Sequence, residues 1–223
     1  MNQVVDVVVN TEKMFEEIAV LCSNLSKNYD SIPAERKQLL AQLADYIVLK
    51  MRQEEPVNLV YVCTHNSRRS HFGQVWAAVA AAHYGCTNVH TFSGGTEATA
   101  FNKNAIAALQ SVGFEITPDS NEENAVYKVI FGDKLFTNCF SKVVDHASNP
   151  KANFAAIMTC SDADENCPFI PGVELRIGTT YEDPKVADGT PQQAEKYKER
   201  SLQIATECLY LFSLVHQQQK VNQ

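Results

Sequence analysis

A short β-favouring run that leads straight into a polar loop, and then into an alanine-rich stretch, constrains the fold more than any other feature. Residues 57–62 read Val-Asn-Leu-Val-Tyr-Val, and residues 64–70 are all polar. Residues 71–84 favour a helix, for which Gly85 is a suitable C-terminal stop. Strand, loop and helix in this order are typical of the opening of a β-α-β unit.

The same alternation continues along the chain. The next expected elements are strands at residues 89–92, 153–159 and 173–177 and a helix at residues 102–112. A last helix is predicted to start with Thr190 as N-cap and Pro191 at its first position, and Gln193 completes a capping box. Strands that alternate with helices favour a parallel sheet covered by helices on both faces.

Two segments lie outside this alternation. Residues 11–55 predict two helices, with Ser31 as the cap of the second and Pro33 in its first turn. Residues 125–131 and 135–144 flank a Gly-Asp-Lys turn and predict a β-hairpin. The expected parts are a helical extension at residues 1–55 and an α/β domain at residues 56–223 with a hairpin insertion at about 119–150.

Charge and cysteine content exclude several classes of protein. The formal net charge is −7, whereas a nucleic-acid binder needs a basic surface. Seven cysteines without a recognisable secretory signal favour a reducing compartment, and we expect a cytoplasmic protein. No apolar run approaches the roughly 20 residues of a membrane helix, so we expect no membrane partner. Because no metal-ligand spacing is evident, we expect no metal and no other cofactor.

The loop after the first strand carries the strongest chemical signal. Residues 63–70 read Cys-Thr-His-Asn-Ser-Arg-Arg-Ser, a C-x5-R-S pattern. A loop between a strand and a helix turns backbone N–H groups towards one point, where the helix dipole favours negative charge. Arg69 would add a fork of donors for a tetrahedral oxyanion, and Cys63 would be the nucleophile, with Ser70 helping its thiolate. The pattern alone leaves open a buried cysteine followed by a solvated loop.

Asp183 follows the fourth expected strand, so we expect it at the same edge of the sheet as Cys63. Pro184 restricts the backbone of Asp183 and thereby limits where its carboxyl group can point. A carboxyl group held near an oxyanion on sulfur is suited to protonate the leaving oxygen. The alternative for an Asp-Pro pair is a simple turn.

Two further cysteines follow the third expected strand. Cys160 and Cys167 are separated by six residues, which is too wide for the usual zinc spacing. If this segment moves, Cys160 could reach Cys63 first and Cys167 later, in a relay of thiol–disulfide exchanges. The spacing alone favours the alternative, two unconnected thiols in a polar turn.

Together these motifs resemble the low-molecular-weight protein tyrosine phosphatase superfamily, and within it the thioredoxin-coupled arsenate reductases, over roughly residues 57–216. The reductase loop Cys-Thr-Gly-Asn-Ser-Cys-Arg-Ser is similar to residues 63–70. The reductases also have two cysteines six residues apart followed by proline, as in residues 160–168. Their acid loop, Asp-Pro, four residues and Gly-Thr, is similar to residues 183–190.

The resemblance implies a flavodoxin-like three-layer sandwich whose four-stranded parallel sheet has the order 2-1-3-4. It also implies that Cys63 attacks an oxyanion, arsenate or a phosphate monoester, while Arg69 holds it and Asp183 protonates the leaving oxygen. In a reductase, Cys160 and Cys167 would pass the disulfide to a thioredoxin-like reductant. In a phosphatase, Cys63 would become phosphorylated and Asp183 would activate water. The implied oxyanion-binding residues are Thr64, His65, Asn66, Ser67, Arg68, Arg69 and Ser70.

Several features depart from the family pattern. His65 replaces a glycine that gives the family loop its unusual conformation, so we expect a strained or reshaped loop. Arg68 replaces a small residue and adds positive charge at the rim. Lys185 stands where phosphatases often have a tyrosine that lines the cleft for aryl substrates. The extension and the hairpin have no counterpart in the minimal fold, and they could cover the site, pack on the sheet or form a homodimer.

Three functions follow from these observations. The three matching cysteines favour a thiol-dependent reductase of the arsenate type. The substituted loop keeps a phosphomonoesterase as the second candidate. A non-catalytic oxyanion-binding or interaction protein, with the extension and the insertion as its working surfaces, is the third.

Overall fold

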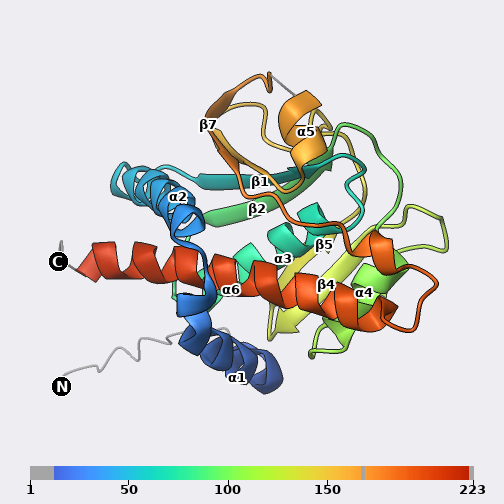
Figure 1. Ribbon diagram of the computed structural model, residues 1–223. Helices are drawn as coiled ribbons and strands as arrows, with labels where there is room; N and C mark the ends of the chain where they lie inside the picture. Colours follow the sequence, from blue (N-terminus) through green and yellow to red (C-terminus); the bar gives the residue numbers. More distant parts are fainter. Residues whose placement is uncertain (1–12, 167–168, 221–223) are drawn as a thin grey trace, which may run out of the picture.

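The computed structural model describes residues 13–166 and 169–220, which form a parallel sheet, an antiparallel sheet and a group of packed helices (Figure 1). The helices are α1 (Glu16–Leu25), α2 (Ala34–Arg52), α3 (Arg69–His83), α4 (Lys103–Gln110), α5 (Ser161–Asn166) and α6 (Gln193–Lys220), with 3-10 turns η1 (Ser26–Ser31) and η2 (Pro184–Ala187). The strands are β1 (Val57–Cys63), β2 (Val89–Gly95), β3 (Glu115–Pro118), β4 (Tyr127–Gly132), β5 (Leu135–Cys139), β6 (Phe154–Met158) and β7 (Val173–Gly178).

The parallel sheet has the order β2-β1-β6-β7. Strand β1 lies in the middle and pairs in parallel with β2 on one side and with β6 on the other. Strand β7 pairs in parallel with β6 and forms an edge. Because β6 and β7 are the third and fourth strands of this sheet along the chain, the predicted order 2-1-3-4 is confirmed.

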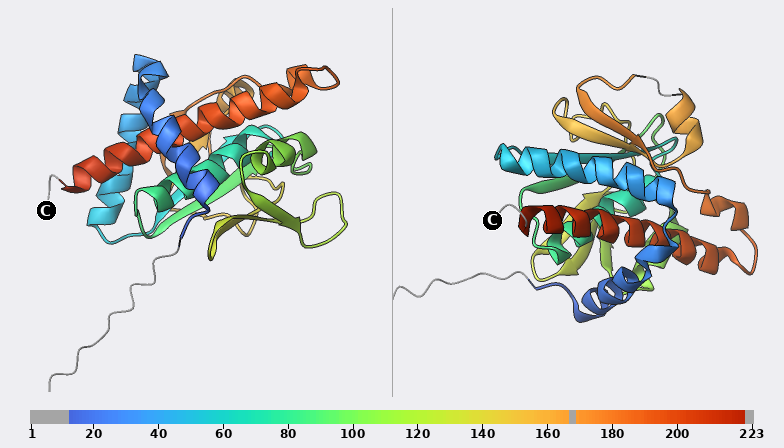
Figure 2. Two further views of the ribbon diagram at one scale, coloured as in Figure 1. Left: turned by 90° about the horizontal axis from the view of Figure 1, so that it is seen from below. Right: turned by 60° about the vertical axis from the view of Figure 1, so that its left-hand side comes forward.

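The two faces of the sheet pack against different partners. Successive side chains of a strand point to opposite faces. From β1, Leu59 and Tyr61 enter the larger core, together with side chains of α2, α3 and α6. Val60 and Val62 face the other way, into a smaller core that includes Ala163 of α5. Helix α6 runs across the whole helical side of the molecule, with α2 beside it (Figure 2).

The predicted hairpin is present as β4 and β5, but it belongs to a three-stranded antiparallel sheet in the order β3-β4-β5. Strand β3 was missing from the sequence prediction because it is only four residues long and buries a single side chain, Ile116. Just beyond β5, Val143 forms a parallel bridge with Gly95 at the end of β2. The two sheets therefore meet at the carboxyl end of β2.

Two helix starts differ from the sequence prediction. Pro33 is the N-cap of α2, which has no side-chain cap, and the Ser31 hydroxyl instead donates to the carbonyl oxygen of Asn28 at 2.6 Å. Helix α6 starts at Gln193 rather than at Pro191. There the Gln193 side chain accepts from the N–H of Gly189 at 2.9 Å, so a turn takes the place of the predicted capping box. At α2 the error arises because a serine hydroxyl can bond backwards along the chain as well as cap the next helix.

The helical extension packs on the rest of the molecule. Helix α2 contacts β1, β7 and α6, and the backbone N–H of Phe15 donates to the carbonyl oxygen of Phe131 in β4 at 2.9 Å. The extension therefore packs on both sheets, one of the three arrangements expected for it, while the domain boundary at residues 55 and 56 stays a prediction. Within the described part of the chain, no helix has the length and apolar character needed to cross a membrane.

Candidate active site

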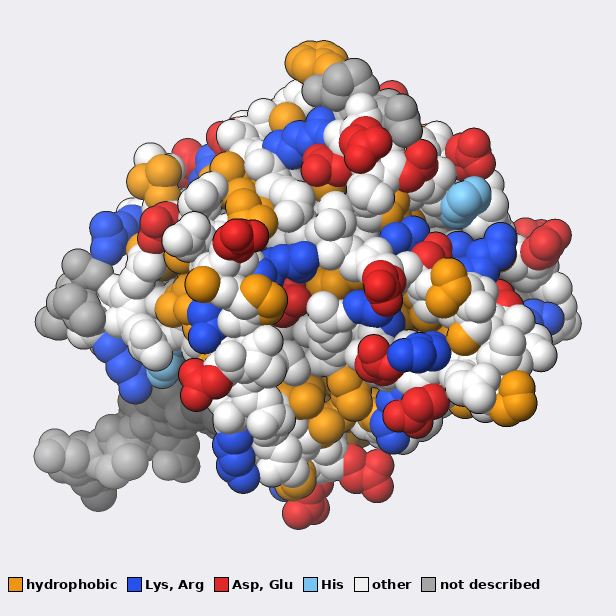
Figure 3. All heavy atoms as spheres, in the orientation of Figure 1, with side chains coloured by type: hydrophobic (Ala, Val, Ile, Leu, Met, Phe, Trp, Pro, Cys, Tyr) orange, Lys and Arg blue, Asp and Glu red, His pale blue; other side chains and the backbone are white. Residues whose placement is uncertain are grey.

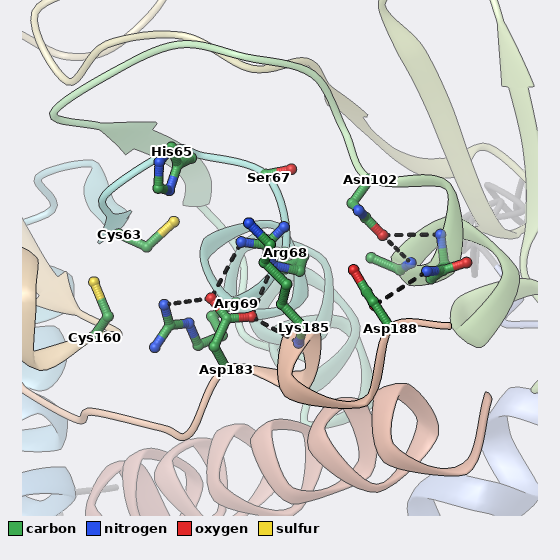
Figure 4. Close-up of polar contacts among 12 residues, drawn as sticks. Cys63, His65, Ser67, Arg68, Arg69, Asn102, Cys160, Asp183, Lys185 and Asp188 are labelled. Carbon is green, nitrogen blue, oxygen red and sulfur yellow. Dashed lines mark hydrogen bonds and ion pairs between the residues drawn. The ribbon is translucent and has the colours of Figure 1, made fainter. Parts of the chain in front are cut away.

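The predicted strand, loop and helix are present around Cys63. Cys63 is the last residue of β1, and α3 begins at Arg69, so the loop spans residues 64–68. The loop lies at the carboxyl edge of the parallel sheet, where open α/β sheets bind ligands (Figure 4). A small space, here called the loop hollow, is lined by Cys63, His65, Ser67, Arg68, Arg69 and Asp183.

The carbonyl oxygens of the loop point outwards. Those of Cys63 and Thr64 accept from the backbone N–H groups of Thr96 and Glu97, at 3.3 and 2.8 Å. The carbonyl of His65 accepts from two hydroxyl groups, and that of Ser67 accepts from the N–H of Asn102 at 3.0 Å. Because the N–H and C=O groups of a peptide point in opposite directions, this arrangement turns the N–H groups inwards. Among the described residues, no acceptor is recorded for the backbone N–H groups of residues 65–68, which suits them to bind an anion.

Asn66 fixes the shape of the loop. It has a φ of 43°, a left-handed conformation that asparagine tolerates better than most residues. Its side chain is fully buried and accepts from the N–H of Lys142 at 2.9 Å, while its amide group donates to Ser70 Oγ at 2.9 Å. The left-handed residue is thus Asn66 and not His65, and the expected strain at His65 is absent. The histidine fits at this position without a left-handed backbone.

Gly95 allows β2 to approach the loop closely. A Cβ atom at this position would lie 2.3 Å from the carbonyl oxygen of Glu97 and 2.6 Å from that of Thr64. Both oxygens belong to the backbone and cannot move aside cheaply. The absence of a side chain at Gly95 therefore lets the loop bond to the segment after β2.

The Cys63 thiol lies next to a hydroxyl donor. Cys63 Sγ is 3.0 Å from Ser70 Oγ, and both residues are buried. Because Ser70 Oγ already accepts from the Asn66 amide, its single proton is available to the sulfur. Asn66 and Ser70 together form a donor chain that ends on Cys63, as a thiolate nucleophile requires.

Both arginines of the loop bind the Asp183 carboxylate. Arg68 donates to it from Nε at 2.8 Å and from Nη2 at 3.2 Å, and Arg69 donates from Nη2 at 2.8 Å. The N–H of Lys185 adds a fourth bond at 3.0 Å, through which Asp183 caps η2. In this structure the carboxylate therefore lies in the loop hollow and occupies donors that an oxyanion would use.

These contacts determine the protonation of Asp183. Burial alone raises the pKa of its carboxyl group, but the Arg68 hydrogen bonds and the Arg69 charge outweigh burial, so the pKa lies below its usual value. The predicted proton donor is thus an anion in this arrangement. To donate a proton, Asp183 must lose part of its contact with the arginines.

The other predicted oxyanion-binding side chains do not point into the loop hollow. Thr64 Oγ1 donates to Asp162 Oδ2 at 2.7 Å, and Ser67 Oγ donates to the carbonyl oxygen of Ala100 at 2.7 Å. The half-exposed His65 ring lies 3.7 Å from Glu97 Oε2 at the rim. Residues 64–67 can therefore contribute backbone N–H groups, while side-chain donors come from Arg68 and Arg69.

Cys160 lies beside the loop. Its sulfur is 3.4 Å from Thr64 Oγ1, and it accepts from the N–H of Ala163 at 3.4 Å, so that it caps α5. The sequence prediction of a polar turn here is wrong, because residues 161–166 form this short helix. The Cys160 side chain is 1% exposed. Cys167, the other predicted relay cysteine, lies outside the described residues.

Sequence reasoning missed one residue that holds Arg69. The carbonyl oxygen of Tyr181 accepts from Arg69 Nη1 at 2.7 Å, two residues before Asp183. The sequence of residues 181–184 predicts a role only for the Asp183 carboxyl group, because no local signal reveals a carbonyl group that binds a distant arginine. Tyr181 and Asp183 together bind both terminal nitrogens of the Arg69 fork.

The surroundings of the site are polar. Acidic and basic side chains are mixed over the face seen in Figure 3, so the negative net charge is not gathered into one patch there. A cleft of about 960 Å³ begins at Ser67 and is bordered by residues 99–103 and by the segment between β3 and β4. Within the described ranges, no group of three or more His, Cys, Asp or Glu side chains is placed to hold a metal ion.

The parallel sheet and the C-x5-R loop at its carboxyl edge define an α/β protein with a candidate anion-binding loop, and comparison with known proteins adds relatives. No protein-family model matches the chain. An arsenate reductase of Oceanobacillus iheyensis is 28% identical over 135 residues, which are 60% of this chain and 79% of the relative. Arsenate reductases are thus homologues of this chain, as the loop motifs predicted.

Among solved structures, a phosphatase and an arsenate reductase are similar to this chain. A low-molecular-weight phosphotyrosine phosphatase from Vibrio cholerae is 15% identical and covers 70% of this chain and 95% of its own, with a TM-score of 0.47. An arsenate reductase in a phosphate-binding state is 17% identical and covers 71% of this chain and 98% of its own, with a TM-score of 0.45.

Proposed function

We propose that this chain is a cysteine-based oxyanion enzyme that reduces arsenate, with Cys63 as the nucleophile and Cys160 as the first relay thiol. One observation carries the proposal: Cys160 Sγ lies 3.4 Å from Oγ1 of Thr64, the residue that follows Cys63 in a loop with inward N–H groups. A phosphatase needs the loop but has no need of a second thiol beside it. The homology with arsenate reductases supports the same assignment.

In the first step, the Cys63 thiolate attacks the arsenic atom, and one arsenate oxygen leaves. The loop N–H groups and the Arg69 fork hold the remaining oxygens, where they stabilise the negative charge of the transition state. The oxyanion must displace Asp183 from Arg69, because both use the same guanidinium donors. Once displaced, Asp183 takes up a proton from the solvent and gives it to the departing oxygen, which leaves as water.

In the second step, the Cys160 thiolate attacks Cys63 Sγ. A sulfur–sulfur bond forms, the sulfur–arsenic bond breaks, and its electron pair stays on arsenic, which leaves as arsenite. Two thiols are oxidised, and arsenic is reduced by two electrons. Cys167 then attacks Cys160, restores the Cys63 thiol and presents the new disulfide to a thioredoxin-like dithiol reductant.

Disulfide mapping tests this sequence. The fully reduced protein is treated with arsenate, blocked with an alkylating reagent and digested for mass spectrometry. We expect a Cys160–Cys167 disulfide in the wild type, a Cys63–Cys160 disulfide in Cys167→Ser and no disulfide in Cys63→Ser. Cys86→Ser is the matched control, because this buried thiol lies outside the loop hollow and its loss should change nothing. A wild-type protein that forms no arsenate-dependent disulfide refutes the reductase assignment.

The cleft beside Ser67 favours a second candidate, a phosphomonoesterase. Its volume of about 960 Å³ is at the upper end of the range for drug-sized ligands and far exceeds the need of a free oxyanion. An ester whose oxyanion binds in the loop hollow could place its leaving group there. This candidate predicts turnover of an aryl phosphate that survives Cys160→Ser and is lost in Cys63→Ser. Turnover that requires Cys160 contradicts it.

A further inference from the structure

A buried charged cluster joins the helical extension to the segment that holds Arg69. Arg36 of α2 forms an ion pair with Glu207 of α6, with 2.7 Å between Nη1 and Oε2. Its other terminal nitrogen, Nη2, donates to the carbonyl oxygen of Thr180 at 2.8 Å. The side chains of Arg36 and Glu207 are only 17% and 4% exposed. The guanidinium fork thus connects two helices of the larger core to the backbone that leads to the site.

Tyr181 strengthens the same connection. The Arg36 guanidinium lies over its ring, 4.9 Å from the centroid, and the Tyr181 hydroxyl donates to Glu207 Oε2 at 2.7 Å. A cation over an aromatic face and a hydrogen bond to a carboxylate both restrict where the ring can go. The Tyr181 ring and the Thr180 carbonyl are therefore held together by residues of α2 and α6.

Residues 180–183, which Arg36 and Glu207 hold from the helical side, also bind Arg69. The carbonyl oxygen of Tyr181 accepts from Arg69 Nη1 at 2.7 Å, and Asp183 accepts from Arg69 Nη2 at 2.8 Å. A displacement of residues 180–183 would therefore turn the guanidinium fork that faces the loop hollow.

We infer that Arg36 is a positioning residue for the Arg69 fork, and that the helical extension supports the oxyanion site through it. Arg36 touches neither Cys63 nor the loop, and it acts through the backbone at Thr180 and Tyr181. The inference rests on the proposed function, because it treats Arg69 as the residue that holds the oxyanion. It gives the extension a role in the site that packing alone would not require.

The choice of variants follows from the burial of Glu207. Burial raises the pKa of its carboxyl group, and the Arg36 charge opposes that rise. Removal of Arg36 alone would leave a buried carboxylate without a cationic partner and would destabilise the protein. Arg36→Lys keeps the charge and loses the two-armed fork. The double variant Arg36→Met with Glu207→Gln removes both charges, and its glutamine can still accept from Tyr181.

The test compares inorganic phosphate binding, measured by calorimetry, and arsenate-dependent kcat/KM in the wild type, Arg36→Lys and the double variant. We expect both variants to fold, to bind phosphate more weakly and to lose at least about tenfold in kcat/KM, because a displacement near 1 Å can cost up to about 100-fold in rate. Lys37→Met is the matched control, since Lys37 is the next residue of α2 and contacts Asp30 and the Tyr210 ring instead. This control should bind phosphate as the wild type does.

Each outcome separates the inference from the proposed function. If folded Arg36→Lys and the folded double variant bind phosphate like the wild type, the inference is wrong and the cluster only stabilises the fold. If the wild type binds phosphate but does not reduce arsenate, the reductase assignment fails, and the binding comparison still decides the role of Arg36. If the wild type does not bind phosphate at all, both the inference about Arg36 and the proposed function are wrong.

Discussion

Arg68 should suppress the proton-donor role of Asp183, and its removal should therefore accelerate the first step. Arg68 contributes two of the four hydrogen bonds to the Asp183 carboxylate, at 2.8 and 3.2 Å. In Arg68→Met, a side chain of similar length without charge, the carboxylate keeps only Arg69 and the Lys185 N–H. Because hydrogen bonds to the charged form lower a carboxyl pKa, the pKa of Asp183 should rise in this variant.

The size of the rise follows from the geometry. A hydrogen bond between charged groups contributes about 1.5–3 kcal/mol, and the two bonds from one fork are not additive. A total of about 1.5–3 kcal/mol corresponds to a roughly 10–100-fold change in the protonation equilibrium of Asp183. Above the pKa, the protonated fraction of Asp183 increases by the same factor. The first step should therefore become about 10–100-fold faster at a fixed pH.

The assay is arsenate-dependent thiol oxidation at saturating arsenate, followed from pH 5 to 7. Saturation removes any loss of oxyanion affinity, and the ratio of variant to wild type at each pH cancels the titration of arsenate itself. Arg68→Lys is the control, since it keeps a charge near Asp183 and should give a smaller increase. A rate for Arg68→Met that equals or falls below the wild-type rate at every pH would refute this reasoning.

Three further perturbations test the site and its support. Gly95→Ala should distort the loop and destabilise the protein by about 1–3 kcal/mol, because its Cβ would lie 2.3 Å from a backbone oxygen. The free energy of unfolding measured in urea and the rate of arsenate turnover should both decrease. Wild-type values for both would contradict the close approach. Asn66→Gly should keep the left-handed backbone but lose the bonds to Lys142 and Ser70. The free energy of unfolding in urea should therefore fall by about 1–3 kcal/mol, and the alkylation of Cys63 should become slower. Burial and the Lys142 charge lower the pKa of His71 to about 3, so an unfolded chain takes up this proton first as the pH falls, and stability is lost between about pH 6.5 and 3. His71→Asn should reduce that loss by up to about 1.4 kcal/mol per pH unit, and an unchanged pH dependence of urea unfolding would show that His71 does not contribute.

The part of the site that could be predicted from sequence is the part encoded locally. Residues 57–84 contain a strand, a polar loop and a helix in direct succession, and the C-x5-R-S spacing lies wholly inside the loop. Asp183 could be placed at the same edge because parallel strands all end on one side of a sheet. The order of the parallel sheet came from the resemblance to a family rather than from the residues alone.

The parts that could not be predicted depend on contacts across the fold. The pair of Arg68 and Asp183 joins residues 115 positions apart, and nothing near either residue encodes it. Asn66 takes the left-handed conformation because Lys142 and Ser70 bind its side chain, whereas the sequence drew attention to its neighbour His65. The backward bond of Ser31 was missed because the same hydroxyl can also cap the next helix.

The outward bonds of the loop also have a consequence for folding. The loop is held by residues far along the chain, since Ser141 donates to the carbonyl oxygen of His65 and the N–H of Lys142 donates to the Asn66 side chain, each across 76 positions. Contacts between such distant residues are slow to form, because the long intervening loop must close first. A fragment that ends before Ser141 would contain the complete C-x5-R-S motif and the bonds from residues 96–102, but it would lack the bonds from Ser141 and Lys142. During synthesis the loop therefore gains these two contacts only after residue 142 has been made, long after Cys63.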